Sequence, residues 1–193
     1  MRLLKKGFLA IVGSALIASS LYSADEFKAL PIFTDDSYCV NMEVSLLGGS
    51  VNFDNSAVKD GSVFGIEASL DCPVFTLPGN NLLRQQFSLN RYSKSGIDIT
   101  TIEVNPYYFI DLSNKLVLGF GPGIGGALVD ADGANKTWMF TYQAGAGLKY
   151  YMDEFLIGLD VRWQGSVQKD YLGTGNKENI DNTKVIAKVG YRF

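Results

Sequence analysis

The sequence predicts an all-β protein, an eight-stranded antiparallel up-and-down transmembrane β-barrel, and three observations lead to this fold class. Apolar and polar residues alternate with a period of two from about residue 40 to residue 193. Many alternating segments are long enough for tilted strands of about nine to eleven residues that cross a bilayer, and longer than the usual strands of soluble proteins. Charged residues gather on one face of each strand, as in a transmembrane barrel with a polar interior.

The first 24 residues have the layout of a secretory signal peptide. A basic segment at residues 2–6 precedes an apolar stretch at residues 7–17, which is too short for a transmembrane anchor. Small residues then favour cleavage after Ser20 or after Ala24. This segment holds three of the 17 basic residues and none of the 20 acidic ones, so the exported chain keeps 14 basic and 20 acidic side chains.

Residues 25–39 show no sustained period. We expect them to form an N-terminal periplasmic lead, with a partial plug of the barrel as the alternative. The β-barrel then covers residues 40–193.

Eight strands account for the alternation in residues 40–193. The expected strands, in chain order, cover residues 40–53, 62–75, 83–93, 98–110, 114–128, 137–151, 155–168 and 183–193. Their apolar faces are represented, in the same order, by Leu46, Ile66, Phe87, Val104, Leu118, Tyr142, Leu159 and Val189. The alternation is clearest in the last strand and weakest in the third.

The opposite faces carry acidic and basic residues in near-balance. The charged residues assigned to this face are Glu43, Glu67, Arg84, Glu103, Lys115, Lys149, Asp160, Arg162, Lys188 and Arg192. An eight-stranded barrel is wide enough only for side chains to fill, and charges in a low-dielectric interior need partners. We therefore expect a charge network in the lumen, with Asp160 and Arg162 at its centre beside Lys149, Lys188 and Glu103.

A soluble barrel also alternates, with its apolar face inward and its charges in water. Aromatic residues favour the membrane alternative, because they fall near the two rims where the girdles of a transmembrane barrel lie. One rim has Phe193, Tyr191, Tyr150, Phe155 and Tyr108, and the other has Trp138, Trp163 and Phe64. Connections also alternate between short turns on the periplasmic side and mostly longer loops outside.

Cys39 and Cys72 lie in a chain bound for an oxidising compartment, which favours a disulfide. They flank the first hairpin at the same end. However, Cys72 shares the apolar face of its strand, whereas Cys39 shares the polar face, and directly opposed residues must share a face. A bulge near Pro73 would allow the pairing, and an unpaired Cys39 is the other solution.

Composition excludes several classes of function. The chain has no histidine, so it has no imidazole for a Ser-His-Asp triad. Its formal net charge of −3 does not suit nucleic-acid binding. The turn at Asp130 and Asp132 lacks the later glutamate of a calcium loop, and the glycines at 121–126 lie in a strand pattern rather than before a helix. We expect no catalytic residue, no metal site and no cofactor.

Segments near the end of the chain resemble the outer-membrane β-barrel family, which includes the OmpA-like transmembrane domains and the opacity-type surface proteins. Residues 140–151 and 156–163 are similar to the last hairpin of that family. Residues 189–193 look like the terminal signal that the barrel-assembly machinery reads, so the resemblance assigns this role to Tyr191 and Phe193. It implies an eight-stranded barrel surrounded by lipids of the bacterial outer membrane, and it carries over no catalytic residue.

The sequence therefore predicts a monomeric integral outer-membrane protein with a structural or surface role and a charged, largely filled lumen. One alternative is a small pore or an OmpW-like channel for small solutes, although the latter needs an apolar lumen. A secreted soluble ligand-binding barrel is another. An enzyme is not expected, because outer-membrane barrel enzymes such as lipid A deacylases, phospholipases and proteases use a catalytic histidine and none is present.

Overall fold

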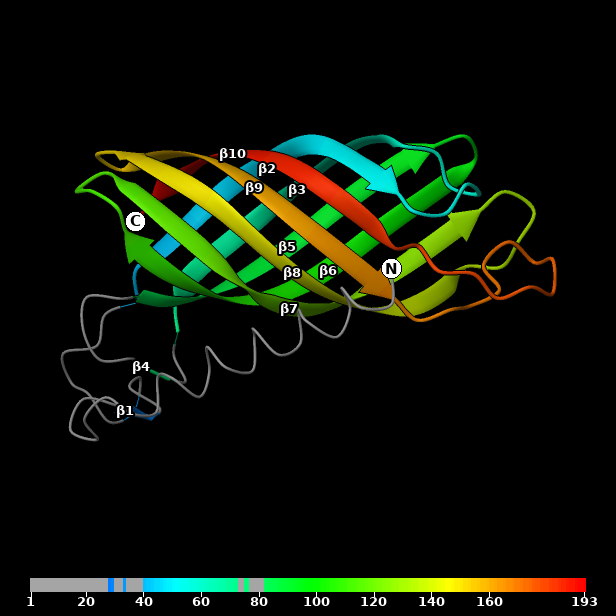
Figure 1. Cartoon of the computed structure of the whole chain (residues 1–193), viewed down its shortest axis with the longest axis horizontal. Helices are drawn as coiled ribbons and strands as arrows, with labels where there is room; N and C mark the ends of the chain where they lie inside the picture. Colours follow the sequence, from blue (N-terminus) through cyan, green and yellow to red (C-terminus); the bar gives the residue numbers. More distant parts are fainter. Residues whose placement is uncertain (1–27, 30–32, 34–39, 73–74, 77–81) are drawn as a thin grey trace, which may run out of the picture.

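The computed structural model describes residues 28–29, 33, 40–72, 75–76 and 82–193 (Figure 1). The expected signal peptide, most of the expected lead and Cys39 lie outside these residues. Within the described part of the chain, no helix is long and apolar enough to cross a membrane. The strands are β1 (Lys28–Ala29), β2 (Met42–Phe53), β3 (Gly61–Asp71), β4 (Phe75–Thr76), β5 (Leu82–Lys94), β6 (Ile97–Asp111), β7 (Leu116–Ala131), β8 (Thr137–Met152), β9 (Phe155–Ser166) and β10 (Asn182–Arg192).

Eight of these strands close into one antiparallel barrel, in the order β10-β2-β3-β5-β6-β7-β8-β9. The ring closes where β10 pairs with β2, with Tyr191 opposite Val44. Figure 1 shows the strands tilted to the long axis of the barrel, with β1 and β4 as a separate two-stranded sheet clear of its wall. The prediction of an eight-stranded antiparallel up-and-down barrel is confirmed.

Two strand boundaries differ by three or more residues from those that the sequence pattern predicts. The alternation predicts a strand over 62–75, whereas β3 ends at Asp71, and β4 pairs with β1 instead of with the barrel. Proline at position 73 explains the early end, because it has no N–H to donate to a ladder. At the other end of the barrel, β7 continues to Ala131 because that residue pairs with Ile97, directly after a tight turn.

The two ends of the barrel differ in their connections. We call one the turn end, where β2 begins, β10 ends and Asp153–Glu154 joins β8 to β9. The other is the loop end, which carries the connections at residues 54–60, 132–136 and 167–181. The loop end also has one short connection, Ser95–Gly96. Both residues have positive φ, 54° and 77°, as a two-residue hairpin turn of type I′ requires.

The faces of the strands show which solvent surrounds the barrel. Apolar side chains point outward over most of its length; Leu46, Ile124 and Val189 are 68%, 57% and 60% exposed. Charged residues such as Glu67 and Arg162 point inward and are buried. An apolar exterior of this extent belongs in lipid rather than water. This arrangement is the reverse of that in a soluble ligand-binding barrel.

Aromatic side chains gather near both rims of the apolar wall. Near the turn end, the ring of Tyr191 packs edge-on against Phe155, with centroids 5.3 Å apart, and against Phe193 at 5.1 Å. Towards the loop end, Tyr142 and Trp163 pack with centroids 5.8 Å apart. These positions are those expected of interfacial girdles.

Candidate functional site: the filled lumen

Ten charged side chains are buried inside the described barrel, five acidic and five basic. They are Glu43, Glu67, Asp71, Glu103 and Asp160, with Arg84, Lys149, Arg162, Lys184 and Lys188. Alternation places them here, because the neighbours of each residue along its strand point to the lipid. They form two clusters along the axis of the barrel, and each cluster has equal numbers of acids and bases.

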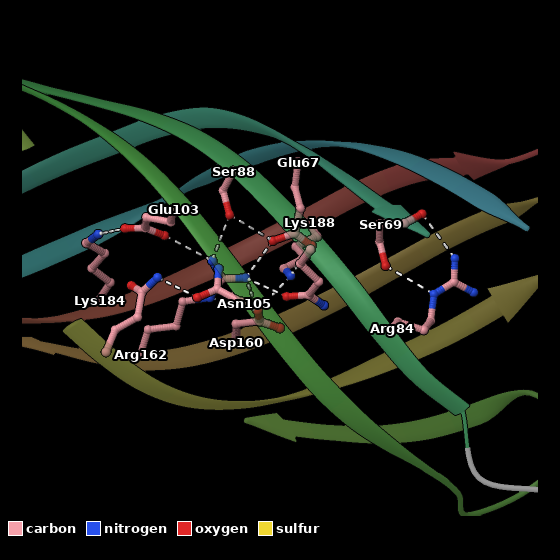
Figure 2. Close-up of polar contacts among 12 residues, drawn as sticks. Glu67, Ser69, Arg84, Ser88, Glu103, Asn105, Asp160, Arg162, Lys184 and Lys188 are labelled. Atoms are coloured by element: carbon pink, nitrogen blue, oxygen red, sulfur yellow. Dashed lines mark hydrogen bonds and ion pairs between the residues drawn. The ribbon is translucent and has the colours of Figure 1, made fainter. Parts of the chain in front are cut away.

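The first cluster lies at mid-barrel, and Arg162 on β9 is its hub (Figure 2). One guanidinium nitrogen lies 2.6 Å from a Glu67 oxygen and 2.8 Å from an Asp160 oxygen. Another lies 3.3 Å from Glu103 and donates to the Ser88 hydroxyl at 3.1 Å. The planar guanidinium has five donors in a fixed fork, so one side chain can bind several carboxylates at once.

Two lysines on β10 complete this central cluster. Lys188 contacts Glu67 and Asp160, each at 2.6 Å. Lys184 contacts Glu103 at 2.6 Å and donates to the side-chain oxygen of Gln164, also at 2.6 Å. The central cluster (Glu67, Glu103, Asp160, Arg162, Lys184 and Lys188) therefore has three negative and three positive side chains, and a formal charge of zero.

A second cluster lies nearer the turn end. Glu43 on β2 contacts Lys149 at 2.7 Å and Arg84 at 3.1 Å, and it accepts a hydrogen bond from the Tyr151 hydroxyl at 2.7 Å. Arg84 also contacts Asp71 at 3.3 Å. This turn-end cluster (Glu43, Asp71, Arg84 and Lys149) is again neutral. Pairing of this kind offsets the desolvation of buried charges without making them a large source of stability.

Glycines on β8 make room for the central cluster. A Cβ at Gly145 would meet the Tyr107 hydroxyl and come within 2.8 Å of the Cγ of Arg162. A Cβ at Gly147 would meet the carboxylate of Asp160. Tyr107 fills the space that Gly145 leaves, and the Arg162 guanidinium lies 5.7 Å from the centre of its ring. The glycine-rich hairpin of β7 and β8 is thus the wall on which the large inner side chains pack.

At the loop end, apolar side chains fill the lumen in place of charged ones. We call this region the apolar cap. Its buried members are Leu47, Val51, Val58, Val63, Tyr92, Ile97, Ile99, Ala127, Val129, Ala131, Met139, Tyr171, Ile180 and Ile186. Tyr171 and Ile180 come from the connection 167–181, which folds inward over the barrel and is fully buried at both residues. The sequence pattern did not predict an apolar region within the lumen.

Hydrogen bonds hold the connection 167–181 in place. Lys169 and Glu178 exchange backbone hydrogen bonds of 3.0 and 2.9 Å. The Asn55 amide from the first loop donates to the Glu178 carboxylate at 2.6 Å. Burial and the nearby negative charge of Glu178 raise the pKa of Tyr171 to about 12, so its hydroxyl stays neutral at physiological pH. The connection is a fixed lid on the lumen.

The structure places eight of the ten expected network residues in the lumen. Asp160 and Arg162 lie together as expected, but Lys149 belongs to the turn-end cluster rather than to the centre. The expectation is corrected for Lys115 and Arg192, which are exposed. Lys115 precedes the first residue of β7, and Arg192 is the last residue of β10, so both reach water at the turn end.

The lumen network also includes two residues outside the predicted set, Lys184 and Asp71, and both lie on the polar faces of their strands. Lys184 shares a strand face with Lys188, and Asp71 shares one with Glu67. Because residues at even spacing along a strand share a face, the sequence was enough to predict that both side chains point into the lumen. Cys72 is buried and forms no disulfide within the described residues, and its pairing with Cys39 stays a prediction because Cys39 lies outside them. In the described part of the chain, no group of three or more histidine, cysteine, aspartate or glutamate side chains could hold a metal ion.

Comparison with known proteins identifies the class through the fold. Neisserial surface protein A (NspA) superimposes with a TM-score of 0.55 and 10% sequence identity, over 80% of this chain and 97% of that one. Ail, the attachment invasion locus protein of Yersinia pestis, gives a TM-score of 0.51 and 16% identity over the same shares. No family model and no curated protein matches the chain. The fold is that of the eight-stranded outer-membrane β-barrels.

Proposed function

We propose that the protein is a non-enzymatic outer-membrane β-barrel with a closed lumen, whose role is structural or is exerted by its loop end at the cell surface. The pairing of all ten buried charges in the described lumen is the observation that carries this proposal. An ion crossing the barrel would have to separate at least one buried pair, and each uncompensated charge would then be costly in the low-dielectric interior.

The apolar cap adds a second barrier. It fills the loop end with close-packed side chains, beneath a connection that is itself buried at Tyr171 and Ile180. A cavity of about 20 Å³ lies below it, too small for a solute path. An OmpW-like channel would need an apolar route through the barrel, whereas the middle of this lumen carries six charges. The names of Ail and NspA refer to attachment, invasion and the surface, which is the setting that we propose for this chain.

Single-channel conductance of the refolded mature protein in a planar bilayer tests the proposal. We expect no discrete current steps from protein whose insertion is verified by protease protection. Arg162→Ala opens the central cluster, and Lys115→Ala changes an exposed charge, so the second variant controls for altered surface charge. Steps in the wild type that change in Arg162→Ala but not in Lys115→Ala would establish a small pore and overturn the proposal.

A further inference from the structure

A belt of neutral polar side chains separates the apolar cap from the central cluster. Asn90 on β5, Gln164 on β9 and Asn182 on β10 belong to it, and they are 2%, 0% and 2% exposed. Gln164 and Asn182 are directly opposed on the neighbouring strands β9 and β10, and Asn90 comes from β5. All three line the same cavity, together with Lys184 and cap residues that include Ile180. The cavity therefore lies at the junction between the apolar and charged parts of the lumen.

Four polar atoms of this belt have no hydrogen-bond partner among the residues that the structure describes. They are the side-chain nitrogen and oxygen of Asn90, the nitrogen of Gln164 and the oxygen of Asn182. The other amide atoms of the belt are engaged: Gln164 accepts from Lys184, and Asn182 donates to the Ile180 carbonyl at 2.8 Å. Buried polar groups are nearly always hydrogen-bonded, so four unpartnered atoms on three residues that line one cavity point to a polar ligand.

The size and chemistry of the cavity identify this ligand. The volume of about 20 Å³ exceeds the roughly 10–15 Å³ that one water molecule requires. Two of the four atoms are donors and two are acceptors. A bound anion would leave the two acceptors unsatisfied, and a bound cation would leave the two donors unsatisfied. Water donates and accepts two hydrogen bonds each, and so matches the set.

We propose that an ordered water molecule is bound in this cavity and joins β5, β9 and β10 across the lumen. Through Asn182 it is linked to Ile180 in the lid, and through Gln164 to Lys184 and the central cluster. The water lies between the apolar cap on the loop side and the ion pairs of the central cluster on the other side. It therefore ties the lid to the charged core.

Asn90→Leu tests the proposal, because a bound water and a dry cavity predict opposite changes in the urea midpoint for unfolding. Leucine matches asparagine in shape but has no polar atom, so the water loses two of its four hydrogen-bond partners. Its release then leaves the Gln164 nitrogen and the Asn182 oxygen without partners. We expect the urea midpoint for unfolding in lipid vesicles to fall. If the cavity were dry, the same substitution would remove two unsatisfied polar atoms without breaking any hydrogen bond. The urea midpoint for unfolding would then rise. A rise would overturn the proposal.

Gln85→Leu is the matched control. The Gln85 side-chain nitrogen also has no hydrogen-bond partner among the described residues, but Gln85 faces outward and does not line the cavity. We expect its urea midpoint to stay the same or to rise. Equal falls in Gln85→Leu and Asn90→Leu would show a general effect of losing an amide, and would contradict the assigned water.

NMR of the wild-type protein in nanodiscs gives a test that does not depend on folding of a variant. We expect nuclear Overhauser cross-peaks between water and the side-chain amide protons of Asn90 and Gln164. The cross-peak at Gln164 should disappear in Asn90→Leu. Assigned amide signals without any water cross-peak in the wild type would refute the bound water.

Discussion

The same strands reverse their pattern between the turn end and the loop end. On β2, Glu43 is buried and Leu46 exposed near the turn end, whereas Val51 is buried and Asn52 exposed near the loop end. On β6, Glu103 is buried beside the exposed Ile102, whereas Ile99 is buried between two polar residues. The barrel is thus of membrane type over most of its length and of soluble type at its loop end.

This reversal shows how one wall meets two solvents. Where lipid surrounds the barrel, the outer face must be apolar, and the alternation leaves the inner face to polar residues. Where water surrounds it, the outer face can be polar, and the inner face forms a conventional apolar core. Charges therefore fill the lumen only in the part that we expect to lie within the bilayer, and hydrophobic packing closes the part that projects beyond it.

The largest expected effect comes from breaking the charge balance of the membrane part. Arg162→Met leaves Glu67, Glu103 and Asp160 with only two lysines. We expect a loss of about 3–5 kcal/mol in the free energy of unfolding, the usual result of leaving a buried charge without its partner. Urea unfolding in vesicles, followed by tryptophan fluorescence, measures this loss.

A second substitution isolates the cause. Arg162→Met combined with Glu67→Gln restores neutrality and keeps the pairs Lys188–Asp160 and Lys184–Glu103. We expect the double variant to be more stable than Arg162→Met alone. If both variants unfold at the same urea concentration, then packing around the guanidinium, and not charge balance, holds the centre of the lumen.

The cap should respond to lost volume rather than to lost charge. Ile186 on β10 is fully buried in the cap, and Ile186→Ala is expected to cost about 2–5 kcal/mol through lost burial and a residual cavity. Val185 is its neighbour on the lipid-facing side and is 39% exposed. Val185→Ala leaves no internal cavity, so its urea midpoint should change less. Comparable losses for both would argue against a close-packed cap.

Thiol labelling locates the depth at which the outer face of the barrel passes from lipid to water. In a background with Cys39→Ser and Cys72→Ser, we expect Asn52→Cys to react with a charged, water-soluble maleimide in vesicles. Leu46→Cys lies on the same outer face of β2, nearer the turn end. It should react at least about tenfold more slowly, because a charged reagent does not enter hydrocarbon. Equal rates would place both positions in the same solvent.

Sequence periodicity predicted the barrel well and the lumen in part. A period of two is a local property, so it identified the strands and the face of each charge. It does not report depth along the axis, which is why Lys115 and Arg192 were placed inside although they lie at the ends of strands. The cap was missed because the apolar residues switch faces within β2 and β6. Contacts such as Asn55 with Glu178 join residues 123 positions apart and have no local signal.

The smallest expected effect is a test of depth along the axis. Lys149 and Lys115 are both lysines near the turn end, but Lys149 is buried against Glu43, whereas Lys115 is exposed. Lys115→Gln should change the free energy of unfolding by no more than about 0.5 kcal/mol, as exposed substitutions usually do. Lys149→Gln should cost several times more, because it leaves Glu43 with Arg84 as its one remaining buried cation. Similar losses for the two lysines would mean that Lys115 takes part in the lumen network after all.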